Sequence, residues 1–283
     1  MCSPGRSRGR CSTTWSRGLL SDLEKKNGWT LAQRAGHTHP GRMQTFLSRG
    51  AWRAEDLETE VRAYVVGHLG APDGVLIVDD TQMIKKGDKS VGVAPQHCGA
   101  TNQIENCQVV VMLTYAGPAG HAFIGHRLYL PKRWTDDAGR CREARIPATV
   151  GFATKLDQAI ELLTEAVDAG VPFGWVTMDG GYGQYPQVSD ETPAGGFAHT
   201  LLIRRSISDP TDVTFFLAHA PDPTPATTLI IVAVTRWRSR RTTNRERSSS
   251  ASISTRSAPG PPGITWSPCA CPPTRSSPCS TPD

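Results

Sequence analysis

Two apolar runs that each end in a carboxylate constrain the fold of this chain more than any other feature. Residues 75–81 read VLIVDDT, and residues 171–179 read VPFGWVTMD. Short continuous apolar runs of this kind predict buried central strands of a sheet. A carboxylate at the end of a buried strand is costly unless it is paired, hydrogen-bonded or bound to a metal ion. The spacing therefore raises the question of whether Asp79 and Asp179 lie side by side.

Three segments have the apolar spacing of helices. Residues 18–35 predict one helix, and residues 54–68 predict a second with Leu57, Val61, Tyr64 and Val65 on its apolar face. Residues 154–169 predict a third, which Thr154 caps and Gly170 ends. Its apolar stripe is expected at Leu156, Ile160, Leu163 and Val167.

The remaining patterned segments predict strands, and together they define the fold class. A β-meander is expected across 89–97, 105–116 and 121–131, with a turn at 116–120, and two later strands at 199–208 and 212–220. Strands followed by a helix that crosses back to a further strand form an α/β or α+β sheet. We therefore predict an α/β protein with a mixed sheet flanked by helices.

The two ends differ in composition from the middle of the chain. Residues 1–16 and 238–283 are rich in Ser, Pro and Arg and almost without aliphatic residues, which predicts disorder. Residues 1–17 and 236–283 together carry a charge of +10, and residues 18–235 carry −5, which gives the net charge of +5. The global basicity therefore says little about the partner of the folded part. No long apolar run or signal peptide is present, and no CxxC pair occurs, so we expect no membrane contact and a cytoplasmic location with reduced thiols.

If Asp79 and Asp179 meet, their like charges make a divalent cation the natural partner. Hard oxygen ligands suit Mg²⁺ or Mn²⁺. Two such ions about 3.5–4 Å apart activate a water or a 3′-hydroxyl and stabilise the leaving oxygen of a phosphodiester. The alternative is that both residues only cap turns or helices at strand ends, as Asp does often.

Four basic residues are candidate phosphate contacts. Lys85 and Lys86 follow the first Asp, and Lys132 and Arg133 precede a polar cluster, Trp134–Asp137, that looks exposed. Each pair also has a simpler interpretation. The first pair fits a solvated turn, and the second fits the start of a capped helix.

Longer motifs carry a resemblance to a known family. The strings VDDT, KKG, KSVGV, LYLPK-x-W, FATK and TMDGGYG occur in order between Arg17 and Gln184. This stretch resembles the DDE-type transposases of bacterial insertion sequences, and within them the DDE superfamily endonucleases. The resemblance resumes over LLIRRS and continues to Arg236-Trp237.

The resemblance implies a ribonuclease-H-like fold in which three carboxylates bind two Mg²⁺ and catalyse DNA cleavage and strand transfer. By motif, Asp79 is the first catalytic and metal-binding acid and Asp179 the second, with Asp80 a neighbour. The implied partners are DNA, as terminal inverted repeats and target, and a second copy in a homodimer. The implied site of action is the nucleoid.

The third acid is where the chain departs from the family. Relatives place it after an Arg-Trp pair in a pattern like RW-x-[VI]-E-E, whereas RSRRTTNRE follows Trp237 here, with Glu246 as the nearest acid. If the codons from Trp237 are TGG CGG TCG AGG AGA, a one-base offset reads Ala-Val-Glu-Glu. The same offset turns GITWSPCAC into an apolar, helix-like run. We therefore predict that the tail from residue 238 is a frameshift product.

The expected organisation follows from these observations. We predict a disordered or non-family segment at 1–16, a helical lead-in at 17–70, a catalytic core at 71–237 with a shortened insertion after 184, and a frameshift tail at 238–283. The resemblance implies DNA-binding helices upstream of RGLLSDL, and we expect residues 1–16 not to supply them. Three functional hypotheses stay open: a weakly active or inactive transposase, a catalytically dead DNA-binding remnant, and a pseudogene product that folds poorly.

Overall fold

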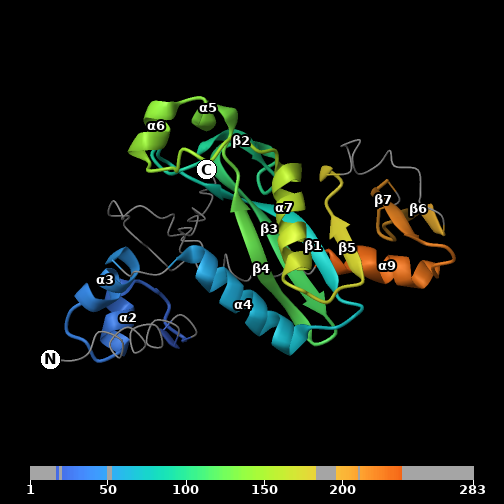
Figure 1. The fold of residues 1–283 in the computed structure, drawn as a ribbon, viewed down its shortest axis with the longest axis horizontal. Helices are drawn as coiled ribbons and strands as arrows, with labels where there is room; N and C mark the ends of the chain where they lie inside the picture. Colours follow the sequence, from blue (N-terminus) through green and yellow to red (C-terminus); the bar gives the residue numbers. More distant parts are fainter. Residues whose placement is uncertain (1–16, 19–20, 50–52, 183–195, 210, 238–283) are drawn as a thin grey trace, which may run out of the picture.

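A five-stranded mixed sheet forms the centre of the molecule (Figure 1). The structure is a computed structural model of the chain, and it describes residues 17–18, 21–49, 53–182, 196–209 and 211–237. The strands run β1 (Val75–Ile84), β2 (Ala94–Cys98), β3 (Gln103–Gly117), β4 (Gly120–Leu128) and β5 (Trp175–Met178). β3 pairs with β1, β2 and β4 in antiparallel fashion, which confirms the predicted meander.

β5 joins the sheet as a parallel neighbour of β1. The chain reaches it through α7 (Lys155–Asp168), because parallel strands need a crossover connection. Thr154 caps α7 by accepting the backbone N–H of Asp157, and Gly170 follows its end at φ +66°, so both predicted boundaries are confirmed. An antiparallel meander followed by a helix and a strand parallel to β1 is the predicted ribonuclease-H-like arrangement.

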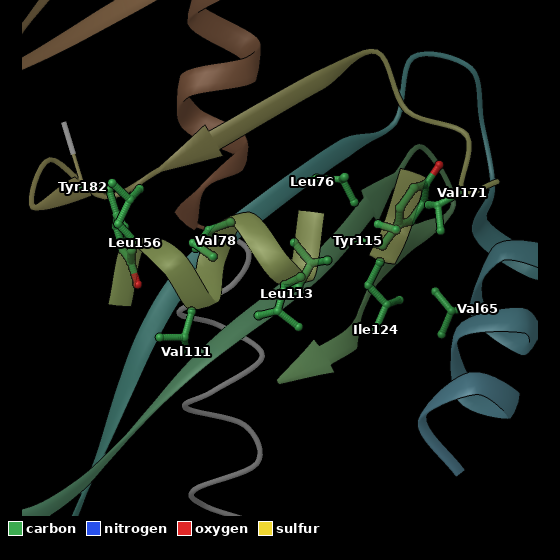
Figure 2. Packing of buried hydrophobic residues seen from close by; sticks show 13 residues of the cluster. Val65, Leu76, Val78, Val111, Leu113, Tyr115, Ile124, Leu156, Val171 and Tyr182 are labelled. Atoms are coloured by element: carbon green, nitrogen blue, oxygen red, sulfur yellow. The ribbon is translucent and has the colours of Figure 1, made fainter. Parts of the chain in front are cut away.

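The two faces of this sheet pack against different helices. Leu76 and Val78 of β1 point into a large apolar cluster with α7 and with α4 (Ala54–Leu69). Figure 2 shows these side chains gathered with Val111, Leu113 and Tyr115 of β3. Val75 and Ile77 point to the other face, where they contact Val232 of α9 (Ala226–Thr235). This alternation follows from the two-residue period of a strand.

The apolar stripe of α7 lies partly on other residues than predicted. Leu156 is buried as expected, but Ile160 and Val167 are 48% and 58% exposed. The buried face consists of Leu156, Ala159, Leu162 and Ala166. Small alanines let α7 approach the sheet, and a Cβ on Gly125 of β4 would come within 2.9 Å of Leu162. The short distance between α7 and the sheet therefore decides which face is buried. The face with the small alanines is buried, and the larger side chains of Ile160 and Val167 are exposed.

The prediction for α4 was wrong on three of four residues. Leu57, Val61 and Tyr64 are exposed, and only Val65 is buried. The face toward the sheet instead carries Glu58 and Arg62, which are one turn apart and 14% and 12% exposed. These charges are tolerated because they pair with each other and with β4 and α7. Apolar spacing could not reveal a helix that packs through an ion-pair network.

The helix predicted over residues 18–35 is shorter in the structure. Gly18 is helical, and the longer described helical part is α2 (Gly28–Arg34), which begins after Asn27 because the Asn27 side chain accepts the backbone N–H groups of Trp29 and Thr30. Residues 21–27 form bends and loops. α2 packs with α3 (Gly41–Arg49) around Leu31, Ala32 and Met43, apart from the sheet (Figure 1).

Two smaller units complete the described fold. The short helices α5 (Lys132–Thr135) and α6 (Ala138–Glu143) pack on Val93 through Trp134. The strands β6 (Phe197–Arg205) and β7 (Val213–Pro221) confirm the two predicted later strands, but they form a separate hairpin ahead of α9. Within the described residues, none of the helices has the length and apolar character needed to cross a membrane. The predicted disordered ends and the shortened insertion lie outside the described residues.

Candidate active site

The two predicted acids occupy neighbouring positions on parallel strands. Val78 of β1 pairs with Met178 of β5. Asp79 and Asp179 directly follow this pair, one on each strand segment. Neighbouring strands lie about 4.8 Å apart, which lets one cation contact two adjacent carboxylates. β1 does not end at Asp79 as predicted but continues to Ile84, because its second half pairs with β3.

The register of β1 and β5 is fixed at the opposite end of the two strands. The buried Tyr115 hydroxyl accepts the backbone N–H of Ala71 at 2.8 Å and lies 2.9 Å from the carbonyl oxygen of Pro172. It thereby ties the loops that lead into both strands. Gly74 permits this contact, since a Cβ there would lie 2.2 Å from the Tyr115 oxygen. A buried tyrosine thus helps to set where the two carboxylates meet.

Asp80 lies on the opposite face of the sheet from Asp79. Its Oδ2 is 2.5 Å from Nζ of Lys155 in α7, and its Oδ1 accepts from Nε2 of Gln82 at 2.6 Å. Both carboxylate oxygens therefore have partners on the α7 face. This placement agrees with the interpretation of Asp80 as a neighbour of the site, and it gives the Lys of the FATK string a structural role.

Asp79 and Asp179 share the face that α9 covers. Each accepts the backbone N–H of the following residue through its Oδ1, at 3.0 Å from Asp80 and 2.6 Å from Gly180. Oδ1 of Asp179 also lies 2.9 Å from Nη2 of Arg236, at the end of α9. The side chain of Asp179 is 41% exposed, so the site is open to solvent on one side.

The donor set of this site fits one hard divalent cation. Mg²⁺ usually binds one or two carboxylates and takes its other ligands from water and phosphate, and the adjacent pair supplies that number. Across the part of the chain that the structure describes, no group of three or more Asp, Glu, His or Cys could hold a metal ion. A second ion would therefore lack its protein ligand there, and the nearest later acid, Glu246, lies outside the described residues.

The four basic candidates lie in two segments outside the carboxylate pair, and their side chains differ in exposure. Lys86 is exposed and Lys85 half-buried in the loop after β1, where the Lys85 N–H donates to the carbonyl oxygen of Asn106 at 2.8 Å. Lys132 and Arg133 are exposed on α5, with Lys132 Nζ 5.2 Å from the centre of the Phe152 ring. Their contact with DNA stays a prediction.

The cluster around Trp134 is only partly the exposed surface that its sequence indicates. Trp134 is 1% exposed, and its indole N–H donates to the carbonyl oxygen of Val93 at 2.8 Å. The guanidinium of Arg140 covers the ring at 3.7 Å. Asp137 caps α6 by accepting the Arg140 N–H, which matches the interpretation as a capped helix start. Trp134 is therefore a structural anchor and no surface contact.

Arg236 is the residue of the site that sequence patterns did not reveal. In the sequence it was noted only as part of the Arg236-Trp237 pair that precedes the third acid in relatives. In the structure it contacts Asp179 directly. A usable signal was available, because an Arg that directly follows the apolar helix sequence ATTLIIVAVT needs a buried partner.

The fold and the acid pair define the class of protein: a ribonuclease-H-like domain with two carboxylates on adjacent parallel strands. Comparison with known families agrees with this class. The profile described as DDE superfamily endonuclease matches residues 2–201. The chain belongs to this family. No solved structure matches it significantly.

A curated relative carries the name "Probable transposase for insertion sequence element IS701", from Microchaete diplosiphon. It is 26% identical over 168 residues, which are 59% of this chain. The same residues span 41% of the relative, so the chain covers less than half of that protein. Resemblance to transposases of insertion sequences, expected from the motifs, is thereby confirmed at the level of the family.

Proposed function

We propose that the chain is a degenerate transposase of an insertion sequence, whose reaction class is metal-dependent DNA cleavage and strand transfer. The observation that carries this proposal is the parallel register of β1 and β5, which makes Asp79 and Asp179 neighbours on one face of the sheet. Family membership supports DNA as the substrate, in the form of terminal inverted repeats and target.

In this proposal the carboxylate pair binds Mg²⁺ or Mn²⁺. A bound divalent ion lowers the pKa of a water or 3′-hydroxyl and stabilises the leaving oxygen of a phosphodiester. Asp79 and Asp179 hold that ion, and the backbone N–H groups of Asp80 and Gly180 orient the two carboxylates. Lys85, Lys86, Lys132 and Arg133 are proposed contacts to DNA phosphates. A homodimer and action at the nucleoid in the cytoplasm stay predictions from the family.

The same proposal holds that two-metal catalysis is incomplete in this chain. Two-metal sites clamp both the attacking and the leaving oxygen, so a site that lacks one of three carboxylates loses most of its electrostatic stabilisation. The frame that follows Trp237 is proposed to have shifted, which removes the Glu-Glu pair that relatives carry there. We therefore expect weak or no strand transfer from the chain as it stands.

Sequencing the gene across the Trp237 codon comes first, because codons that do not read Ala-Val-Glu-Glu in the offset frame contradict the frameshift. The second step compares two proteins on duplex DNA with the terminal inverted repeats of the element. One is the full chain. The other is the product of a gene in which one extra G is inserted directly after the Trp237 codon, which restores the offset reading frame. Only the frame-restored protein should nick the DNA with Mn²⁺, and its Asp79→Asn variant should not.

Two results would overturn this function. If the frame-restored protein fails to nick with either Mg²⁺ or Mn²⁺, the endonuclease assignment fails. If the unmodified chain nicks equally well, the degeneracy fails. The absence of a three-ligand metal cluster among the described residues favours one alternative, a catalytically dead DNA-binding remnant. That alternative predicts binding to inverted-repeat DNA in fluorescence anisotropy with no metal dependence. A pseudogene product that folds poorly predicts no cooperative thermal unfolding.

A further inference from the structure

Arg236 is a buried cation at the edge of the candidate site. It is 8% exposed although it follows directly on the last residue of α9. An arginine guanidinium keeps its proton under all ordinary conditions, so its charge cannot be relieved by deprotonation. A buried charge of this kind requires an anionic partner. Asp179 is such a partner, with Nη2 and Oδ1 separated by 2.9 Å.

The packing of α9 aims Arg236 at the carboxylate pair. Val232 of α9 contacts the apolar residues Val75 and Ile77, which precede Asp79 on the same face of β1. Arg236 lies four residues after Val232, on the same side of the helix. Val232 therefore packs on the apolar residues of β1, and Arg236, one helical turn later, contacts Asp179 just after β5. The negative end of the helix dipole also favours a cation at this position.

The ion pair uses an atom that a metal would need. Oδ1 of Asp179 accepts both the Gly180 N–H at 2.6 Å and the Arg236 guanidinium at 2.9 Å. Arg236 thus supplies at Asp179 the positive charge that a divalent cation would bring. Two cations beside one carboxylate repel each other, so a bound metal ion and this ion pair oppose one another.

We propose that Arg236 is an internal counter-ion that competes with the divalent cation for Asp179 and so sets the metal affinity of the site. The inference rests on the proposed function, because it takes Asp79 and Asp179 as the metal ligands. Without metal, Arg236 offsets the repulsion between the two carboxylates and holds Asp179 in place. When a divalent cation binds, the guanidinium leaves Oδ1. Arg236 is a positioning residue here, and its charge is the property that matters.

Mn²⁺ titration of the full chain without DNA tests the competition directly. Free Mn²⁺, followed by its electron paramagnetic resonance signal, reports binding to the unmodified chain and to Arg236→Gln, Arg236→Lys and Asp179→Asn. Removal of one adjacent positive charge should strengthen binding by about tenfold or more in Arg236→Gln. Arg236→Lys keeps the charge and should stay within about threefold of the unmodified chain. Asp179→Asn should lose binding.

The outcomes separate this inference from the function on which it rests. Equal or weaker Mn²⁺ binding by Arg236→Gln overturns the counter-ion role alone, provided that the unmodified chain binds Mn²⁺. No binding by any of the variants overturns both the role and the metal site. Binding that Asp79→Asn leaves unchanged also overturns both, because the bound ion is then elsewhere.

Two further measurements keep the test decisive if a variant folds poorly. Thermal unfolding in the presence of a chelator shows whether Arg236→Gln is folded, and Arg236→Met, which keeps the aliphatic stem, serves as its replacement. In the unmodified chain, the Nε–H signal of Arg236 in nuclear magnetic resonance should shift as Mg²⁺ is added. The signal is assigned by its loss in Arg236→Lys. No shift at saturating Mg²⁺ overturns the inference without any substitution near Asp179.

Discussion

The two faces of the central sheet treat neighbouring acids in opposite ways. Asp80 points to the α7 face, where Lys155 and Gln82 occupy both of its oxygens beside a large apolar cluster. Asp79 points to the α9 face, where the buried cluster among the described residues is smaller and consists of Val75, Ile77 and Ala116, with Trp175 and Val232 packed against it. One step along a strand therefore separates a structural acid from a candidate metal ligand. The α7 face, with the larger buried apolar cluster, contributes more to stability, and the α9 face, with the smaller cluster, leaves the carboxylates accessible.

The largest expected difference between the faces is in metal binding. Asp79→Asn should abolish Mn²⁺ binding because it removes one of two ligands. Asp80→Asn should leave binding within about threefold, since its side chain lies on the other face of the sheet. Isothermal titration of the two variants measures this directly. Similar losses in both would mean that the faces are not functionally separate.

Core substitutions should sharpen the contrast in stability. Leu162→Ala empties a fully buried position on the α7 face, and we expect a loss of about 2–5 kcal/mol in the free energy of unfolding. Val232→Ala removes a partly buried side chain on the α9 face and should cost roughly 1 kcal/mol. Urea unfolding of both variants gives the comparison. If Val232→Ala lost more free energy of unfolding than Leu162→Ala, it would contradict the view that the α9 face contributes less to the core.

The Lys155–Asp80 pair should contribute less than the apolar contacts around it. Both side chains are partly exposed, at 33% and 22%, so solvent screens their attraction. Lys155→Met should therefore lower the free energy of unfolding by about 1 kcal/mol or less. Denaturant midpoints at low and high salt provide the measurement. A loss that does not shrink with added salt would argue for packing of the lysine stem as the source.

A further comparison concerns the ion pairs of α4, whose contribution to stability is present at neutral pH and is lost at acidic pH. Burial raises the pKa of Glu58, but hydrogen bonding and charge from His126, with Arg127 nearby, outweigh it and lower the pKa below 4.5. A carboxyl group with a lowered folded pKa stabilises the fold above its unfolded pKa, and that stability disappears as pH falls through the folded pKa. Glu58→Gln should cost about 1 kcal/mol at pH 7.

The matched comparison is the pH profile of unfolding for the two chains. The stability difference between the unmodified protein and Glu58→Gln should be constant from neutral pH down to about 4.5 and shrink below it. A difference that is the same at pH 3 as at pH 7 would contradict the lowered pKa. His126→Phe is a useful control, because it removes the first of the groups that lower the pKa.

Local patterns predicted the elements of this fold well where one physical rule dominated. The strand at VLIVDDT, the meander and the capped helix after Thr154 all follow from apolar runs, turn residues and a hydroxyl cap. The helix faces were predicted less well, because close packing against Gly125 and an ion-pair network around Glu58 chose them. Neither effect leaves a periodic apolar signal. The disordered ends and the frameshift tail stay predictions.

The apolar runs that end in a carboxylate drew attention to Asp79 and Asp179, and the resemblance of the surrounding motifs to the DDE family then made them the predicted acids. Only the tertiary structure decided that they are neighbours, because the register of two strands a hundred residues apart depends on contacts such as those of Tyr115 with Ala71 and Pro172. It also decided that Arg236 meets Asp179, through the packing of α9 on the sheet. The sequence indicates which carboxylates follow apolar strands, and long-range packing decides which charged groups are buried and which face each other.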